Sequence, residues 1–102
     1  MGKKCIYIAG PTTGSGAELF DKYEEWLTAK GHKVINPTAV LPKGLTAERE
    51  MRARLGLIDC ADLVLFLPGA DENAGSLCEF AYCRAVKKPR TFSIHELEGV
   101  RS

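Results

Sequence analysis

Two runs dominated by apolar residues constrain the fold of this chain more than any other feature. Residues 4–9 and 61–67 are almost entirely apolar and include β-branched and aromatic side chains. A strand that is covered by helices on both faces needs no polar side, so such runs are typical of buried strands in a parallel sheet. The sequence therefore favours an α/β fold.

Helix signals separate the apolar runs. Ser15-Gly16-Ala17-Glu18 fits a capping box, Gly31 is placed to end that helix, and Thr46 can cap a second helix. We expect strands at residues 4–9, 33–36, 61–67 and 90–94, helices over about 15–30 and 76–88, and loops at 37–45 and 68–73. The helix after Thr46 has Met51, Leu55 and Ile58 on its apolar face.

This alternation of strands and helices predicts one small domain over residues 1–102. Strands that alternate with helices form a parallel sheet with helices on both faces. Right-handed crossovers limit the strand order to 2-1-3-4, a Rossmann-like or flavodoxin-like arrangement of about four strands. The chain has 102 residues, which suits a single core.

Composition argues against several classes of protein. The net charge is +1 at pH 7, which offers no general attraction for a long nucleic acid or an acidic membrane, and no apolar run approaches the roughly 18 residues of a membrane span. The four cysteines form no C-x-x-C pair, which favours reduced thiols in a cytoplasmic protein. No His, Cys, Asp or Glu cluster has metal-ligand spacing, so we expect neither a metal nor a cofactor.

The loop after the first strand is a candidate ligand site. Its glycines at positions 10, 14 and 16 fit neither the dinucleotide fingerprint nor the phosphate loop of nucleotide hydrolases. Glycines still allow a ligand to approach the backbone closely, although a flexible turn would need them too. The candidate binding residues here are Ala9, Gly10, Pro11, Thr12 and Thr13.

The segment Asn73-Ala74-Gly75-Ser76-Leu77-Cys78-Glu79 is a second candidate, and Glu79 has two interpretations. Ser76-x-x-Glu79 is itself a capping-box pattern, in which the carboxylate serves only the helix. Alternatively, Glu79 holds a sugar hydroxyl or attacks an anomeric carbon, as nucleophilic carboxylates do in glycosyl chemistry. The candidate binding residues are Asn73, Gly75, Ser76 and Glu79.

These segments together resemble a known superfamily. Tyr-Ile-Ala-Gly-Pro at 7–11, Asp-Cys-Ala-Asp at 59–62, Leu-Pro-Gly at 67–69 and Gly-Ser-x-x-Glu-x-Ala at 75–81 follow the pattern of the nucleoside 2-deoxyribosyltransferase-like proteins over about residues 3–93. Within them, the chain is most similar to the small phage-borne branch (domain of unknown function 4406). That branch includes the second type of Thoeris anti-defence protein.

The resemblance implies roles for several residues. In the transferases a glutamate at the position of Glu79 is the nucleophile, and a tyrosine at the position of Tyr7 orients it. Two further positions are acidic in those enzymes, but this chain has Asn73 and Arg54 there. An amide and a guanidinium do not supply a proton to a leaving base, whereas arginine at such a site suits a phosphate.

Two functions from different classes remain open, and a third option is a structural or interaction module with a vestigial pocket. The first is a binding protein that sequesters a nucleotide-derived immune messenger, cyclic ADP-ribose-like or a cyclic oligonucleotide, in the host cytoplasm if it is phage-encoded. The second is a 2-deoxyribosyltransferase or nucleotide N-glycosidase. Trp26 either packs in the core or stacks on an adenine ring. As in the transferases, we expect a homodimer or homotetramer.

Overall fold

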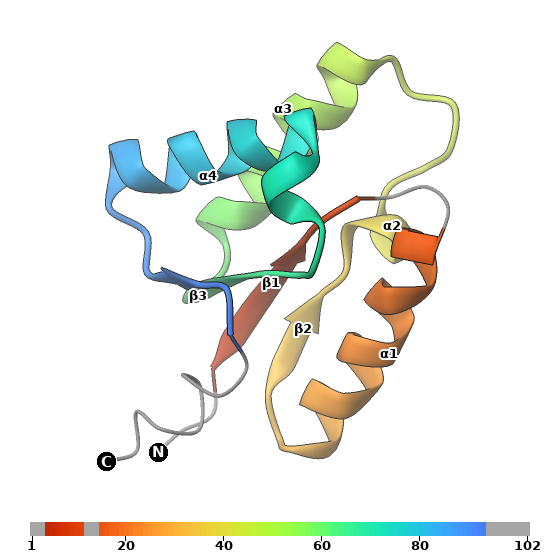
Figure 1. Ribbon diagram of the computed structural model, residues 1–102, viewed down its shortest axis with the longest axis vertical. Helices are drawn as coiled ribbons and strands as arrows, with labels where there is room; N and C mark the ends of the chain where they lie inside the picture. Colours follow the sequence, from red (N-terminus) through yellow and green to blue (C-terminus); the bar gives the residue numbers. More distant parts are fainter. Residues whose placement is uncertain (1–3, 12–14, 94–102) are drawn as a thin grey trace.

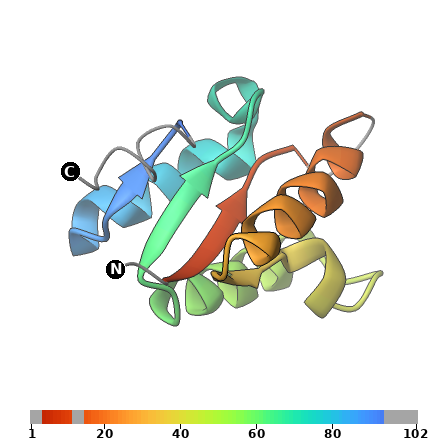
Figure 2. The ribbon, with the colours of Figure 1, turned by 90° about the horizontal axis from the view of Figure 1, so that it is seen from below.

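The strands form one parallel sheet, as the sequence predicts. The computed structural model describes residues 4–11 and 15–93, excluding the side chains of Ser15 and Ala17. Its strands lie in the order β2-β1-β3-β4, and every pairing is parallel. Figure 2 shows β4, β3 and β1 side by side with their arrowheads pointing the same way. The strands are β1 (Cys5–Ala9), β2 (Lys33–Ile35), β3 (Leu63–Phe66) and β4 (Arg90–Thr91).

Helices cover both faces of this sheet, which confirms the expected fold class. In Figure 1, α3 and α4 lie close together and away from α1. The helical elements are α1 (Ser15–Ala29), α2 (Pro37–Val40), α3 (Ala47–Asp59), the 3₁₀ turn η1 (Ala70–Glu72) and α4 (Ala74–Val86). No helix in the described part of the chain is both long and apolar enough to cross a membrane.

The alternation of side chains along β1 divides the core into two layers. Ile6 and Ile8 point to one face, where they pack with Phe20 and Leu27 of α1. Tyr7 and Ala9 point to the other face, which α3 and α4 cover. The side chain of Tyr7 therefore extends from a central strand toward α3 and α4.

Most helix ends agree with the sequence signals. Gly31 has a φ of 95°, which glycine adopts without strain, and it follows α1 as predicted. Thr46 is the N-cap of α3, and its side chain accepts a hydrogen bond from the Arg49 N–H.

Several boundaries differ from the expectation. The loop expected at 37–45 contains α2, because the Asn36 side chain accepts from the Thr38 N–H and Pro37 occupies the first helical turn. Helix α4 begins two residues before Ser76. The fourth strand covers only Arg90–Thr91, and residue 94 lies outside the described residues.

Candidate functional site

A buried hydrogen bond between Tyr7 and Glu79 is the centre of the candidate site. The Tyr7 hydroxyl of β1 donates to Oε2 of Glu79 on α4, at 2.5 Å, and both side chains are fully buried. Burial raises the pKa of Glu79, and burial together with the neighbouring Glu79 raises the pKa of Tyr7. Tyr7 thus remains protonated and holds one oxygen of the carboxyl group in place.

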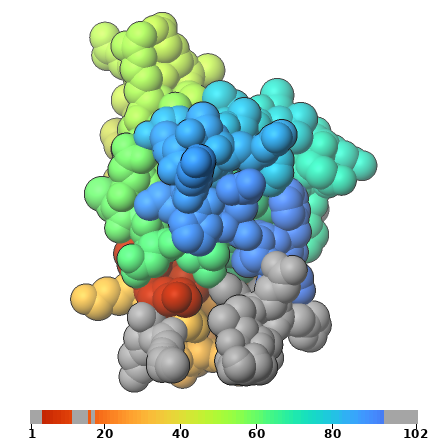
Figure 3. All heavy atoms as spheres, turned by 90° about the vertical axis from the view of Figure 1, so that its left-hand side faces the viewer, coloured from red at the N-terminus to blue at the C-terminus, as the bar shows by residue number. Residues whose placement is uncertain are grey.

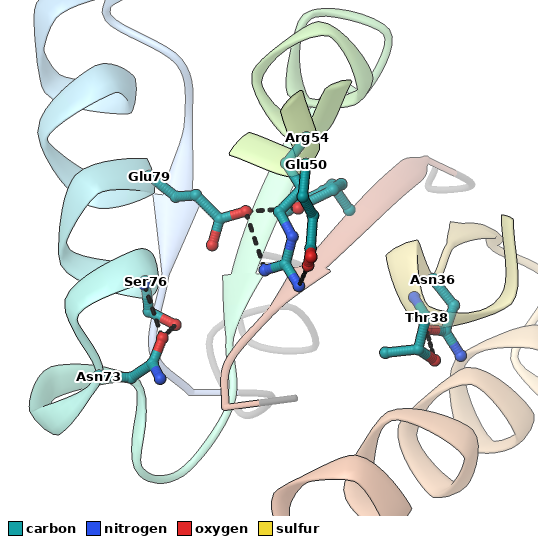
Figure 4. A network of polar contacts seen from close by, with 8 residues as sticks. Asn36, Thr38, Glu50, Arg54, Asn73, Ser76 and Glu79 are labelled. Carbon is teal, nitrogen blue, oxygen red and sulfur yellow. Dashed lines mark hydrogen bonds and ion pairs between the residues drawn. The ribbon is translucent and has the colours of Figure 1, made fainter. Parts of the chain in front are cut away.

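Arg54 on α3 faces the same carboxyl group. Its Nη1 lies 3.8 Å from Oε2 of Glu79, and its Nη2 donates to Oε2 of Glu50 at 2.5 Å. Figure 4 shows Glu79 reaching from α4 toward Arg54 and Glu50 on α3. The guanidinium opposes the effect of burial on the pKa of Glu79.

Two atoms of this network are left without a partner. Among the described side chains that are not exposed, Nε of Arg54 and Oε1 of Glu79 are the buried polar atoms that make no hydrogen bond. A buried donor or acceptor without a partner is costly, and such groups are typical of sites that receive a ligand or water. These two atoms can therefore accept or donate a further hydrogen bond to a ligand or to water.

Asn73, not Ser76, caps the neighbouring helix. The Asn73 side-chain oxygen accepts from the Ser76 N–H at 2.8 Å and from the Ser76 hydroxyl at 2.9 Å. Glu79 consequently lies in the second turn of α4, where its carboxyl group accepts the hydrogen bond from the Tyr7 hydroxyl. This excludes the interpretation of Glu79 as a capping residue.

A cleft of about 180 Å³ opens between the first half of α3 and the start of α4. The first turn of α4 carries no acidic residue, so its N–H groups and the helix dipole present positive potential there. With Arg54 in the wall, the cleft suits an anionic group. It is lined by Ala47, Glu50, Met51, Arg54, Asn73 and Gly75.

The structure brings most of the predicted site residues together, but not those of the first loop. Tyr7, Arg54, Asn73, Gly75, Ser76 and Glu79 all belong to the cleft or to the network beside it. Ala9 and Gly10 are buried at the end of β1, and neither they nor Pro11 line the cleft. Thr12 and Thr13 lie outside the described residues.

The glycines of the first loop have a packing explanation. A Cβ on Gly10 would lie 3.1 Å from Cβ of Leu67, and a Cβ on Gly16 would lie 2.7 Å from the Pro11 carbonyl oxygen. Gly16 therefore lets the helix start approach the Pro11 backbone, whereas Gly10 gives room to the Leu67 side chain.

Trp26 lies on the opposite face of the sheet from the cleft. Its ring packs at the edge of the core layer under α1, and Nζ of Lys30 lies 4.7 Å from the ring centroid. A ligand held between α3 and α4 does not reach this ring, so Trp26 is not part of the cleft.

Glu50 and Met51 are site residues that the sequence analysis did not identify. The Met51 side chain, at an apolar position of α3, lines the cleft. The signal for Glu50 was present in the sequence, because Glu50 and Arg54 have the i, i+4 spacing that pairs side chains along a helix.

Comparisons with known proteins identify the family and the fold of the chain. Residues 4–92 match the family described as a domain of unknown function (DUF4406). The chain belongs to the DUF4406 family. A comparison with curated protein sequences finds no match. Within the described residues, no group of three His, Cys, Asp or Glu side chains could hold a metal ion.

Solved structures show the same fold in 2-deoxyribosyltransferases. The enzyme from Bacillus psychrosaccharolyticus has a TM-score of 0.68 and 22% identity, over 84% of this chain and 69% of that one. The 2-desoxiribosyltransferase from Leishmania mexicana has a TM-score of 0.66 and 21% identity, over 85% of this chain and 61% of that one. At these identities the likeness establishes that this DUF4406 protein shares their fold.

Proposed function

We propose that this DUF4406 protein binds a nucleotide-type ligand, with ribosyl and phosphate groups, between α3 and α4 and does not break its glycosidic bond. The observation that carries the proposal is the guanidinium of Arg54, which lies 3.8 Å from the Glu79 carboxylate and also lines the cleft.

A cation in this position weakens Glu79 as a nucleophile. Glycosyl transfer needs an ionised carboxylate whose charge stabilises an oxocarbenium-like centre. Burial raises the pKa of Glu79, so ionisation costs this carboxyl group more than it costs an exposed glutamate. When Glu79 does ionise, Arg54 offsets its charge.

Among the described residues that line the cleft, none is placed as a free proton donor for a departing base. Protonation by a positioned acid typically accelerates such a step by about 10²–10⁴-fold. The Asn73 amide is not an acid at neutral pH, and the Arg54 guanidinium does not release its proton. Glu50, the remaining ionisable group of the cleft wall, is engaged by Arg54.

The positive groups of the cleft support a phosphate-bearing ligand. Arginine can bind phosphate through two parallel hydrogen bonds, and helix N-termini bind anions. In its most specific form, the proposal is that the ligand is a cyclic ADP-ribose-like or cyclic oligonucleotide immune signal. The protein would then act as a phage anti-defence protein that binds this signal in the host cytoplasm and withholds it from the immune effector. This specific form of the proposal is based on the sequence resemblance.

Cleavage of a nucleoside or nucleotide is the second candidate function. It is favoured by the Tyr7–Glu79 hydrogen bond, which fixes one carboxyl oxygen and leaves Oε1 without a partner. That arrangement would suit a 2-deoxyribosyltransferase or N-glycosidase with Glu79 as nucleophile. The fold shared with 2-deoxyribosyltransferases agrees with it.

One experiment separates the two functions. The protein is incubated with deoxynucleosides, deoxynucleotides and cyclic ADP-ribose isomers, and the small molecules are identified after heat denaturation. Intact ligand recovered in amounts up to one per binding site is the expected result. Free base in molar excess over the protein, abolished by Glu79→Ala, would establish the enzyme instead.

We also propose that a second copy of the chain associates with this one. Leu77, Val86 and Phe92 are large apolar residues that are about half exposed, and they belong to α4 or follow β4. Figure 3 faces the side of the molecule on which α4 and β4 lie. Apolar groups of this kind favour a homodimer or homotetramer, which sedimentation velocity measures directly.

A further inference from the structure

We infer that Glu50 occupies, in the ligand-free protein, the place on Arg54 that a phosphate or pyrophosphate of the ligand takes. Glu50 would then determine how strongly the cleft prefers phosphorylated ligands. This inference rests on the proposed function, because it concerns the same cleft.

The two carboxylates that face Arg54 differ in how easily they can leave. The Glu79 side chain is fully buried and held by Tyr7. The Glu50 side chain is 38% exposed, whereas that of Arg54 is 6% exposed. Glu50 can therefore rotate into water when a ligand phosphate takes its place on Arg54, while Arg54 stays in the wall of the cleft.

Arg54 has donors that Glu50 does not use. The guanidinium carries five N–H donors, and its Nε makes no hydrogen bond. Phosphate offers more acceptor oxygens than a carboxylate and matches the planar fork of arginine. A ligand phosphate that replaces Glu50 would thus satisfy a donor that is orphaned in the free protein.

The start of α4 adds a second source of positive potential beside Arg54. Ser76 N–H is capped by Asn73, and no hydrogen bond of the described residues uses the N–H groups of Ala74 and Gly75. Gly75 lines the cleft, and a Cβ at this position would lie 3.5 Å from Cε of Met51, at ordinary van der Waals distance. The first turn holds no carboxylate that would compete for the anion.

Glu50→Gln tests the inference, because it removes the negative charge and keeps the shape of the side chain. Glu48→Gln is the matched control: it breaks the Glu48–Arg52 pair, which has the same spacing on the same helix but is exposed and outside the cleft. Each variant is titrated with pyrophosphate by calorimetry. Urea unfolding of each variant verifies that it is folded, and Glu50→Ala serves as a second variant.

We expect Glu50→Gln and Glu50→Ala to bind pyrophosphate on the order of tenfold more tightly than the wild type. Glu48→Gln should remain within about twofold of the wild type. Equal affinities for the Glu50 and Glu48 variants, or no binding by any of them, would overturn the inference.

A second pair of titrations separates this inference from the proposed function. Adenosine and ADP-ribose differ by their phosphates and the second ribose. Glu50→Gln should tighten ADP-ribose binding and leave adenosine binding unchanged. An equal gain for both ligands would refute the role of Glu50 while the binding function stands. Wild-type protein that binds neither of these, nor any ligand in the recovery experiment, would refute the proposed function itself.

Discussion

At the scale of single residues, Arg54 affects both stability and ligand binding, because it pairs with two carboxylates and also lines the cleft. It is a buried cation whose partners, Glu50 and Glu79, lie on two different helices. A buried ion pair contributes little compared with apolar packing, but removal of one partner leaves the other charge without compensation. The site is therefore sensitive to the loss of this one side chain.

Arg54→Ala should lower the free energy of unfolding by about 3 kcal/mol at pH 7, because it leaves Glu79 buried without its cation. Arg52→Ala is the control, since its pair with Glu48 is exposed and should cost no more than about 0.5 kcal/mol. Urea unfolding of both variants measures the difference. Equally small losses of unfolding free energy in both variants would show that the contact between Arg54 and Glu79 does not stabilise the fold to this extent.

The raised pKa of Glu79 predicts a dependence of stability on pH. Since the pKa is raised from its ordinary value of 4.5, the folded protein holds this proton more tightly than the unfolded chain does. This contribution is fully present below pH 4.5 and is lost as the pH rises through the folded-state value. Between the two pKa values the slope is about 1.4 kcal/mol per pH unit.

Glu79→Gln removes this titration. The stability of the wild type relative to Glu79→Gln should therefore fall as the pH increases above 4.5 and then level off. Urea unfolding of both proteins from pH 4 to pH 8 gives this difference. A difference that stays constant or grows with pH would contradict the assignment of Glu79 as a buried group with a raised pKa.

At the scale of elements, the position of one cap decides what Glu79 does. Ser76 and Asn73 both carry a side-chain oxygen that can cap a helix, so the sequence did not distinguish them. With Ser76 as the cap, Glu79 would be the third helical residue and could complete a capping box. With Asn73 as the cap, Glu79 is the sixth residue and turns toward Tyr7 in the sheet.

The pairs Glu48–Arg52 and Glu50–Arg54 of α3 also show that a local sequence pattern does not determine the role of a side chain. Both have i, i+4 spacing and look equivalent in the sequence. Only the packing of α3 against α4 shows that Arg52 is exposed and Arg54 is buried. Local patterns thus predict where α3 lies, whereas the chemistry of its side chains depends on the neighbouring helix.

At the scale of the whole molecule, the strand order was predictable and the location of the cleft was not. Apolar runs and right-handed crossovers are enough to predict the order β2-β1-β3-β4. The sequence analysis placed both loop segments at one ligand-binding rim. Among the described residues, a cleft lies between α3 and α4, and Trp26 lies on the opposite face of the sheet. Thr12 and Thr13 lie outside the described residues, so a role of the first loop stays a prediction.

The measurement that tests the central claim most directly is an NMR titration of isotopically labelled protein with ADP-ribose. If the ligand binds between α3 and α4, backbone signals of residues 47–54 and 73–79 should shift most, and the Arg54 Nε–H signal should move with them. The indole signal of Trp26 and the signals of α1 should stay in place. Largest shifts in α1 and at Trp26, with residues 47–54 and 73–79 unchanged, would contradict the account.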